Sequence, residues 1–250
     1  LDAAEAAACD DSGWVSVDLP HTASMPYWND MTEVWEGDSC YRKTFAAPGD
    51  WQDLCGYADF EGAFQHAWIY LNGALLGENK GGYTGFQIDM TPALRFSEEN
   101  VLTVRVQNGW DAQIAPRAGD TVFMNGLNRN VRFITTQAQH VDWFGQAITT
   151  PEVSHEQASL RVATEIKNRD SKSVSCEVVV EVMDSDGNTV ASTKDGATLV
   201  PNGGTTVTQD LPTINTPKLW SPETPHLYDV RTHIYRGKQL VDTYTERVGI

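Results

Sequence analysis

The amino-acid sequence predicts an all-β protein made of two β-sandwich domains in series. Alternating apolar and polar residues recur along the chain, with turn signals at a spacing that is typical of sandwiches and barrels. The regular exchange of strands and helices that a (β/α)₈ barrel requires is absent. Of the 24 aromatic residues, 20 precede residue 146. This uneven distribution predicts two domains with different roles, and places a ligand in the aromatic first half.

The first half contains one strong hairpin and few helical patterns. Residues 67–71 and 74–76 flank Asn72-Gly73, and both turn residues tolerate the positive φ of a type I′ turn. Leu102, Val104 and Val106 alternate with polar residues, which predicts a half-buried strand. The Ala-rich residues 2–9 favour one short helix, and residues 91–96 favour a single helical turn.

The second half consists of plainer alternating strands. Residues 160–167 and 176–182 each place apolar side chains on one face. Asp186-Gly187 and Arg236-Gly237 are suited to close two further hairpins. We therefore predict a first domain over residues 1–138 and a second over 139–250, the latter of the size of an immunoglobulin-like sandwich.

Charge and composition exclude several functions. The chain has 18 Lys and Arg against 34 Asp and Glu, a formal charge of −16, which argues against nucleic-acid partners and anionic membrane surfaces. It contains no apolar run of the ~18–20 residues that a membrane helix needs. The first five residues do not resemble a signal peptide, and the localisation stays open.

Neither a metal site nor a cofactor is expected. The six histidines never adopt a ligand spacing such as H-x-x-x-H, and the four cysteines form no C-x-x-C pair. Buried or idle thiols are the simplest interpretation of Cys9, Cys40, Cys55 and Cys176, although a Cys40–Cys55 disulfide is left open.

Seven motifs, in order, carry a resemblance to a known family. Residues 68–77 read W-I-Y-L-N-G-A-L-L-G, and residues 81–89 read G-G-Y-T-G-F-Q-I-D. They resemble a stretch of the sugar-binding domain of glycoside hydrolase family 2, which contains β-galactosidases, β-glucuronidases and β-mannosidases. Residues 19–22 (L-P-H-T), 40–45 (C-Y-R-K-T-F) and 126–131 (G-L-N-R-N-V) agree with flanking motifs. The last of these motifs and the residue before it depart from the family's pattern. Asn125, Asn128 and Asn130 replace the usual Gly, Tyr and Asp.

Two further motifs extend the resemblance to the end of the chain. Residues 219–228, L-W-S-P-E-T-P-H-L-Y, and 246–250, E-R-V-G-I, are similar to those that close the family's immunoglobulin-like domain. The resemblance implies a jelly-roll β-sandwich of the galactose-binding-like type, followed by an immunoglobulin-like β-sandwich.

The resemblance also implies that this chain holds no catalytic residue. In the family, retaining hydrolysis uses two Glu side chains on a barrel, about 5–5.5 Å apart across the scissile bond. The acid/base Glu there follows an Asn, and this chain has no Asn-Glu dipeptide. We therefore expect the non-catalytic N-terminal part of a β-glycosidase, inactive by itself, with a carbohydrate and its own C-terminal barrel as partners.

Asp120 is the first candidate substrate-binding residue. In the β-galactosidase branch, the loop before the G-I-F-R motif brings an Asp into the cleft, near the sugar and a bound cation. Asp120 lies nine residues before Arg129, at the matching position. An ionised carboxylate there accepts hydrogen bonds from sugar hydroxyls. An ordinary loop carboxylate is the alternative.

Trp28 and Asn29 are the second candidates. They belong to the segment Y-W-N-D-M-T-E-V-W at 27–35, which combines aromatic faces with acids and an amide, the groups that stack on a sugar and bind its hydroxyls. The segment is similar in position to a family loop that reaches the catalytic cleft. A core or interface role for the two Trp residues is the alternative.

Two other functions stay open at this point. The first domain is a candidate for a free-standing, lectin-like carbohydrate-binding module without a hydrolase role, and a purely structural or adhesive pair of sandwiches is the plainest alternative. The sequence selects neither the sugar nor the linkage, and it is compatible with a homo-oligomer.

Overall fold

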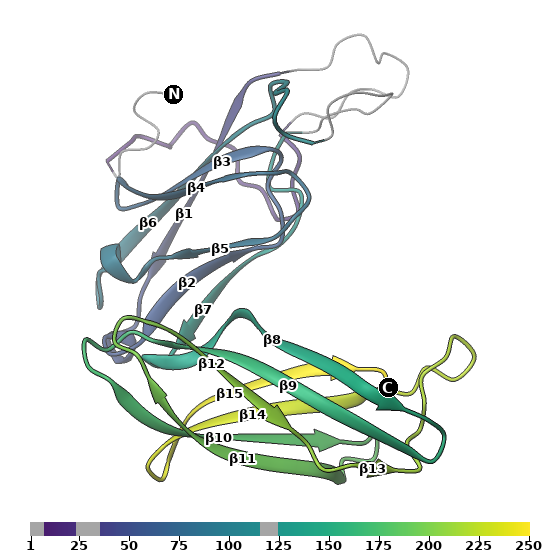
Figure 1. The fold of residues 1–250 in the computed structure, drawn as a ribbon. Coiled ribbons are helices and arrows are strands. Elements are labelled where there is room, and N and C mark those ends of the chain that lie inside the picture. Colours follow the sequence, from purple (N-terminus) through teal and green to yellow (C-terminus); the bar gives the residue numbers. More distant parts are fainter. Residues whose placement is uncertain (1–7, 24–35, 116–124) are drawn as a thin grey trace. The chain divides into compact units, whose positions relative to one another are not determined.

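A computed structural model describes residues 8–23, 36–115 and 125–250, and almost all of the regular structure in them is β-strand (Figure 1). The predicted all-β fold is therefore confirmed. The chain divides into two compact units, Leu1–Thr135 and Thr136–Ile250, here called unit 1 and unit 2. No helix among the described residues is long and apolar enough to cross a membrane.

Unit 1 contains two sheets, and its pairs β1–β6, β3–β6, β3–β4 and β2–β5 are antiparallel. The four-stranded sheet has the order β1-β6-β3-β4, and the three-stranded sheet has the order β5-β2-β7. The strands of these sheets are β1 Asp38–Ala46, β2 Cys55–Phe60, β3 His66–Leu71, β4 Ala74–Lys80, β5 Phe86–Asp89, β6 Glu99–Gln107 and β7 Val131–Thr136. Two 3₁₀ turns, η1 Gly49–Trp51 and η2 Thr91–Ala93, lie between strands.

Apolar side chains from both sheets form the core of unit 1. Leu102, Val104 and Val106 of β6 are buried, as their alternation predicts. They join a cluster that includes Phe60 of β2 and Phe86 of β5, whose rings stack with centroids 4.7 Å apart. The core therefore lies between the two sheets, which makes unit 1 a β-sandwich.

The Asn72-Gly73 hairpin forms as predicted between β3 and β4. Asn72 has φ 54° and Gly73 has φ 84°, the positive values that the turn requires. The pairing of β3 with β4 is interrupted by a register shift between Ile69 and Tyr70. The predicted turn at residues 91–96 begins with η2, whereas the predicted helix over residues 2–9 falls mostly outside the described residues.

Unit 2 is a second antiparallel sandwich. One sheet has the order β11-β10-β14-β15, and in the other β9 pairs with β12, β13 and β8. The bounds are β8 Gln139–Val153, β9 Gln157–Asn168, β10 Val174–Met183, β11 Thr189–Leu199, β12 Gly203–Asp210, β13 Ile214–Asn215, β14 Tyr228–Arg236 and β15 Gln239–Val248. Asp186-Gly187 lies in the β10–β11 connection, as predicted. The second predicted hairpin also forms, but Arg236 is the last residue of β14 and Gly237-Lys238 make the connection to β15.

Alternation also determines the core of unit 2. Cys176, Val178, Val180 and Val182 of β10 are buried on one face. They pack in two clusters with side chains of β9 and β14, so both sheets again contribute to one interior. Cys176 belongs to this core, and all four cysteines of the chain are free thiols. The Cys40–Cys55 disulfide that the sequence left open is not formed.

A buried histidine makes the stability of unit 2 depend on pH. His140 is 4% exposed, and its Nδ1 donates to the carbonyl oxygen of Gln137 at 2.8 Å. Burial lowers the pKa of His140, assisted by Arg169 and opposed by the Gln137 carbonyl and the charges of Asp242 and Asp142. An unfolded chain's His titrates near ~6.5, so below that pH the unfolded state binds more protons than the folded state.

We expect His140 to leave the unfolding free energy of unit 2 at its full value above pH 6.5. Below that pH, this group should lower the unfolding free energy by at most about 1.4 kcal/mol per pH unit. Urea unfolding at pH 7.5, 6.5 and 5.5, for the wild type and His140→Gln, checks this. The variant should have a flatter slope, and equal slopes would contradict the prediction. Burial raises the pKa of Asp242, whose stabilising contribution is lost as pH rises through that pKa. Because the charges of His140 and Asp242 act on each other, the difference between the two proteins reports His140 together with this coupling.

Candidate functional site

The three predicted substrate-binding residues lie outside the described residues. Trp28 and Asn29 belong to segment 24–35, and Asp120 belongs to segment 116–124. The residues that flank these segments are described, and three residues at or next to their ends lie close together in unit 1. Here "roots" means Ala23, which precedes segment 24–35, Gly37, which follows that segment after Glu36, and Asn125, which follows segment 116–124.

Backbone hydrogen bonds join Ala23 directly to Asn125. The N–H of Ala23 donates to the carbonyl oxygen of Asn125 at 2.7 Å, and the N–H of His21 donates to that of Leu127 at 2.8 Å. Residues 21–23 therefore run beside residues 125–127. The start of one candidate segment and the end of the other are thus held together, although about a hundred residues separate them in the sequence.

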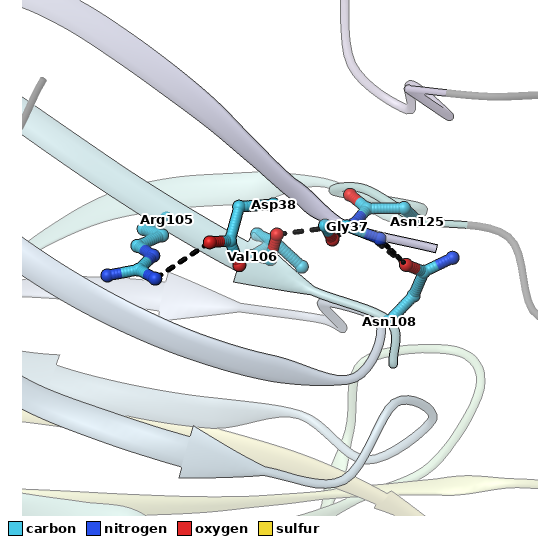
Figure 2. A network of polar contacts seen from close by, with 6 residues as sticks. All are labelled: Gly37, Asp38, Arg105, Val106, Asn108 and Asn125. Carbon is cyan, nitrogen blue, oxygen red and sulfur yellow. Dashed lines mark hydrogen bonds and ion pairs between the residues drawn. The ribbon is translucent and has the colours of Figure 1, made fainter. Parts of the chain in front are cut away.

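The side chain of Asn125 adds the third root (Figure 2). Its Nδ2 donates to the carbonyl oxygens of Gly37 at 2.8 Å and Val106 at 3.2 Å, and lies 3.4 Å from Oδ1 of Asn108. Asn108 accepts from the N–H of Gly37 at 2.9 Å. The hydroxyl of Ser39 donates to Oδ1 of Asn125. Asn108 and Asn125 are fully buried, so water does not compete for these bonds.

Gly126 allows this close approach. Its φ of +141° is a conformation that L-residues avoid, and a Cβ atom would lie 2.5 Å from the carbonyl oxygen of His21 and 2.6 Å from the hydroxyl of Tyr41. That hydroxyl lies 3.0 Å from Nδ1 of His21, and burial raises the pKa of Tyr41. The motif glycine is therefore required by its surroundings.

An ion pair and an aromatic stack extend from the roots across the sheet. Asp38, next to Gly37, pairs with Arg105 at 2.7 Å (Figure 2). The guanidinium of Arg105 lies 5.1 Å from the ring centroid of Trp68, which stacks on His66 at 3.6 Å. Nε2 of His66 lies 3.1 Å from a carboxylate oxygen of Glu78. Such partly buried contacts position strands β1, β6, β3 and β4, and the cation of Arg105 lies between an opposite charge and an aromatic face.

Two hollows of unit 1 lie near these elements. One, of about 760 Å³, is lined by Asp11, by residues 14–17 and 39–44, and by His21 and Ala23, so it reaches one of the roots. The other, of about 410 Å³, is mainly apolar and is lined by core residues such as Phe60, Leu102 and Phe133. Concave surfaces of this kind accommodate small ligands or a neighbouring segment.

The described residues lack a candidate metal centre: they contain no group of three or more His, Cys, Asp or Glu that could hold an ion. The turn at Asp184–Gly187 has two carboxylates at a spacing similar to the start of a calcium-binding loop. Asp184, however, binds backbone groups of the turn itself. One carboxylate oxygen of Asp184 accepts from the N–H groups of Asp186 and Asn188, both at 2.9 Å, and these bonds lower its pKa.

Sequence reasoning did not find Asn108, Ser39 or Gly37 as part of the site. Their bonds to Asn125 span 17 to 88 residues, and no local pattern indicates such a separation. Asn125 carried one signal, since it departs from the family's motif. That departure is explained by the space and the three acceptors around its amide.

Solved structures of glycosidases share this fold. The crystal structure of a β-glucuronidase from Bacteroides uniformis matches with a TM-score of 0.92 and 32% identity, covering 100% of this chain and 30% of that chain. A putative β-galactosidase from Bacteroides fragilis matches with a TM-score of 0.88 and 26% identity, covering 96% of this chain and 37% of that chain. The fold and the roots thus define a pair of β-sandwich domains of the kind found in glycosidases.

Sequence comparison identifies the family. The chain is 31% identical to a β-galactosidase of Bacteroides ovatus over 248 residues, or 96% of this chain and 28% of that protein. It is 28% identical to a β-glucuronidase of Formosa agariphila, over 96% of this chain and 27% of that protein. The family model "Glycosyl hydrolases family 2, sugar binding domain" matches residues 8–137, and "Glycosyl hydrolases family 2" matches 140–250. The chain therefore belongs to glycosyl hydrolase family 2, and the resemblance in its motifs is confirmed.

Proposed function

We propose that this chain is the non-catalytic N-terminal part of a retaining β-glycosidase and that it shapes the substrate cleft of the full-length protein. Family membership supports the proposal, as does the share of the relatives' length that the chain spans, 28% for the Bacteroides ovatus protein. The catalytic carboxylates then lie on a barrel in the remainder of the protein. In this proposal the first domain comprises residues 1–138 and the second 139–250.

The observation that carries the cleft-shaping role is the meeting of the roots. Ala23, Gly37 and Asn125 are joined by hydrogen bonds, so the segment with Trp28 and Asn29 and the segment with Asp120 depart from one place on unit 1. Ligand sites are commonly built from loops that a rigid sandwich holds at one end. We therefore propose that both segments contribute to one substrate cleft.

Each proposed residue has a distinct role. Asp120, as a carboxylate, accepts hydrogen bonds from sugar hydroxyls, which are stronger than those to neutral acceptors. Trp28 provides an aromatic face for an apolar face of the sugar ring, and the amide of Asn29 both donates and accepts. None of the three takes part in bond cleavage.

The substrate class is a β-linked glycoside. The relatives described above are named β-galactosidases and β-glucuronidases, so we propose a galactoside or a glucuronide as substrate. The net charge of −16 suits an uncharged sugar but does not decide between the two. Assays therefore need both nitrophenyl β-glycosides. Assembly into a homo-oligomer is compatible with the proposal and not required by it.

Asp120→Ala in the full-length enzyme is expected to lower kcat/KM about 10- to 100-fold, because a hydrogen bond to a charged group contributes about 1.5–3 kcal/mol. Asp53→Ala, which removes an exposed carboxylate, is the matched control and should leave kcat/KM unchanged. An unchanged kcat/KM for Asp120→Ala would refute its role. The 250-residue chain alone should turn over neither substrate.

The same chain tests the lectin alternative. We expect no heat of binding when it is titrated with galactose, glucuronate or mannose, because the proposed cleft also needs the barrel. Binding at millimolar concentration or tighter, together with a full-length protein inactive on every nitrophenyl β-glycoside, would replace the glycosidase proposal by the lectin.

A further inference from the structure

Strand β8 carries an irregular insertion near its start. Val141 pairs with Ile166 of β9, and the next paired residue, Gln146, lies opposite Thr164, so residues 142–145 of β8 face a single residue of β9. Among the described strands only β9 pairs with β8, so the insertion lies on an edge strand. Insertions of this kind redirect side chains out of the regular alternation. Residues 142–145 are here called the β8 bulge.

Two aromatic side chains of the β8 bulge face solvent. Phe144 is 73% exposed, the largest value for any aromatic side chain that the structure describes, and Trp143 is 37% exposed. Their ring centroids are 4.5 Å apart, with the ring planes at 64°. Single apolar residues on a surface are common, whereas clustered aromatic side chains are typical of the anchors of interfaces. These two residues, here called the aromatic pair, form a small apolar patch on unit 2.

The β8 bulge holds Phe144 in a backbone conformation that bulky residues avoid. Its φ is +49°, in the left-handed region. Gly and Asn adopt that region at lower cost, so a position that served only as a turn would be better filled by one of them. Strain of this kind is typical of functional positions, where a side chain is kept for what it contacts. The conformation therefore does not explain the presence of Phe144, whereas a contact of its ring would.

Contacts on two sides hold the β8 bulge in place. Oδ1 of Asp142 accepts from the N–H of Trp143 at 2.8 Å, and Oδ2 of Asp142 lies 3.0 Å from Nζ of Lys167. Gly145 packs directly on the main chain, because a Cβ atom there would lie 2.8 Å from the carbonyl oxygen of Asp142 and 2.9 Å from that of Glu165. The aromatic pair is thus presented on an ordered support, which reduces the entropy lost on binding.

The size of the patch favours a partner that is covalently attached. Stable association of separate proteins buries about 800 Å² on each partner, from about 20–30 residues. Two side chains cover far less area, so the aromatic pair by itself does not hold a second copy of the chain. A linked partner is present at a high effective concentration and needs less contact. The chain spans 28% of the Bacteroides ovatus β-galactosidase and 30% of the Bacteroides uniformis β-glucuronidase, so the proposed full-length protein supplies such a partner.

We propose that the aromatic pair is a docking surface of unit 2 for the C-terminal remainder of the full-length protein. Phe144 and Trp143 are the apolar anchors of the contact, and the ion pair of Asp142 with Lys167 lies at its rim, where polar groups surround such anchors. The inference rests on the proposed function, because that proposal provides the remainder. It extends the proposed function by naming the residues of unit 2 that bind it.

Hydroxyl-radical footprinting, read by mass spectrometry, measures the accessibility of each ring. In the 250-residue chain Phe144 and Trp143 should react readily, because they are exposed, whereas the fully buried Phe60 should not react. In the full-length protein the reactivity of Phe144 should fall to the level of Phe60. Equal reactivity of Phe144 in the two proteins would overturn the proposal.

Other occupants of the patch give different footprints. A second copy would protect Phe144 in the 250-residue chain at high concentration and expose it on dilution, with a dimer visible in sedimentation. Protection of Phe144 within the 250-residue chain at every concentration would place its partner in that chain itself. Either result would overturn the proposal.

Phe144→Asn separates the role of the ring from that of the backbone, because Asn tolerates a positive φ. In the 250-residue chain its unfolding midpoint should equal or exceed that of the wild type, since strain is relieved and an exposed ring is lost. A lower midpoint would show that the ring stabilises unit 2 itself, and would overturn the proposal.

In the full-length Phe144→Asn protein, Trp143 should become as reactive as it is in the 250-residue chain. Val190→Asn is the matched control, because it removes a side chain that is also 37% exposed but lies on β11, in the other sheet of unit 2. Trp143 should stay protected in this control. Protection of Trp143 that persists in full-length Phe144→Asn would contradict the role of the ring as an anchor.

Activity distinguishes a failure of this proposal from a failure of the proposed function. A full-length protein that hydrolyses a nitrophenyl β-glycoside, but leaves Phe144 as reactive as in the 250-residue chain, would overturn the docking surface only. A full-length protein that is inactive on every such glycoside, with Phe144 protected, would refute the proposed function and leave the docking surface in place.

Discussion

Gly126→Ala is expected to destabilise unit 1 by about 3–5 kcal/mol, since backbone strain and steric overlap add at one position. The φ of +141° is accessible to glycine and not to alanine. The new methyl group would meet the carbonyl oxygen of His21 at 2.5 Å and lie 3.2 Å from the backbone nitrogen of Ala23. Both are main-chain atoms, so no side-chain rotation relieves the overlap.

Urea unfolding followed by Trp fluorescence measures this effect, because six of the eight Trp residues precede residue 136 and the other two, Trp143 and Trp220, report unit 2. Gly187→Ala is the matched control. Gly187 also has a positive φ, +83°, but no atom lies within 4 Å of a Cβ built there. Its cost should be limited to backbone strain of about 1 kcal/mol. Equal destabilisation by the two variants would contradict the steric part of the explanation for Gly126.

Gly82→Ala has the second largest expected effect on stability, about 2–4 kcal/mol, although no positive φ is involved. A Cβ at Gly82 would enter the space of the Phe64 ring, 2.6 Å from Cε2 and closer still to Cδ2. Phe64 is 1% exposed, and its N–H donates to the carbonyl oxygen of Gly126 at 2.9 Å. The ring is therefore enclosed, and we expect its displacement to be costly.

A double-mutant cycle tests this explanation. Phe64→Leu removes part of the ring, so Gly82→Ala should cost at least 1 kcal/mol less in that background, within the usual range of about 0.5–3 kcal/mol for contacting residues. Gly77→Ala is the control, because its Cβ would meet only the tip of Ile88, Cδ1 at 3.0 Å, which can rotate. An additive cycle would show that the Phe64 ring is not the obstacle.

The architecture could be predicted from sequence because local patterns determine it. The strict alternation of residues 176–182 left no ambiguity about the buried face of β10, and the Asn72-Gly73 pair specified a hairpin. Irregular pairing was not predictable. In β8 the register to β9 shifts between Val141 and Gln146, and Phe144 there has φ +49°. Residues 142–145, D-W-F-G, contain a glycine but no Asn-Gly or Asp-Gly pair.

The candidate site was predictable only in part, because its contacts join segments that are far apart in the sequence. The motifs indicated which segments to consider, and they led to Trp28, Asn29 and Asp120, whose roles stay predictions. The network at the roots depends on tertiary contacts between β1, β6 and Asn125, and a buried amide has no sequence period. Asn125 was visible beforehand only as a departure from a motif, and its bonds explain why a larger side chain is tolerated there.

The register shift between Ile69 and Tyr70 bears on how unit 1 resists aggregation with other chains. It lies in the hairpin whose outer strand, β4, is an edge of the four-stranded sheet. Exposed edges are templates on which a foreign strand can add, and irregular pairing or charged side chains make such addition unfavourable. β4 has both, since it ends in Glu78, Asn79 and Lys80. This edge is therefore a poor seed for intermolecular β-aggregation.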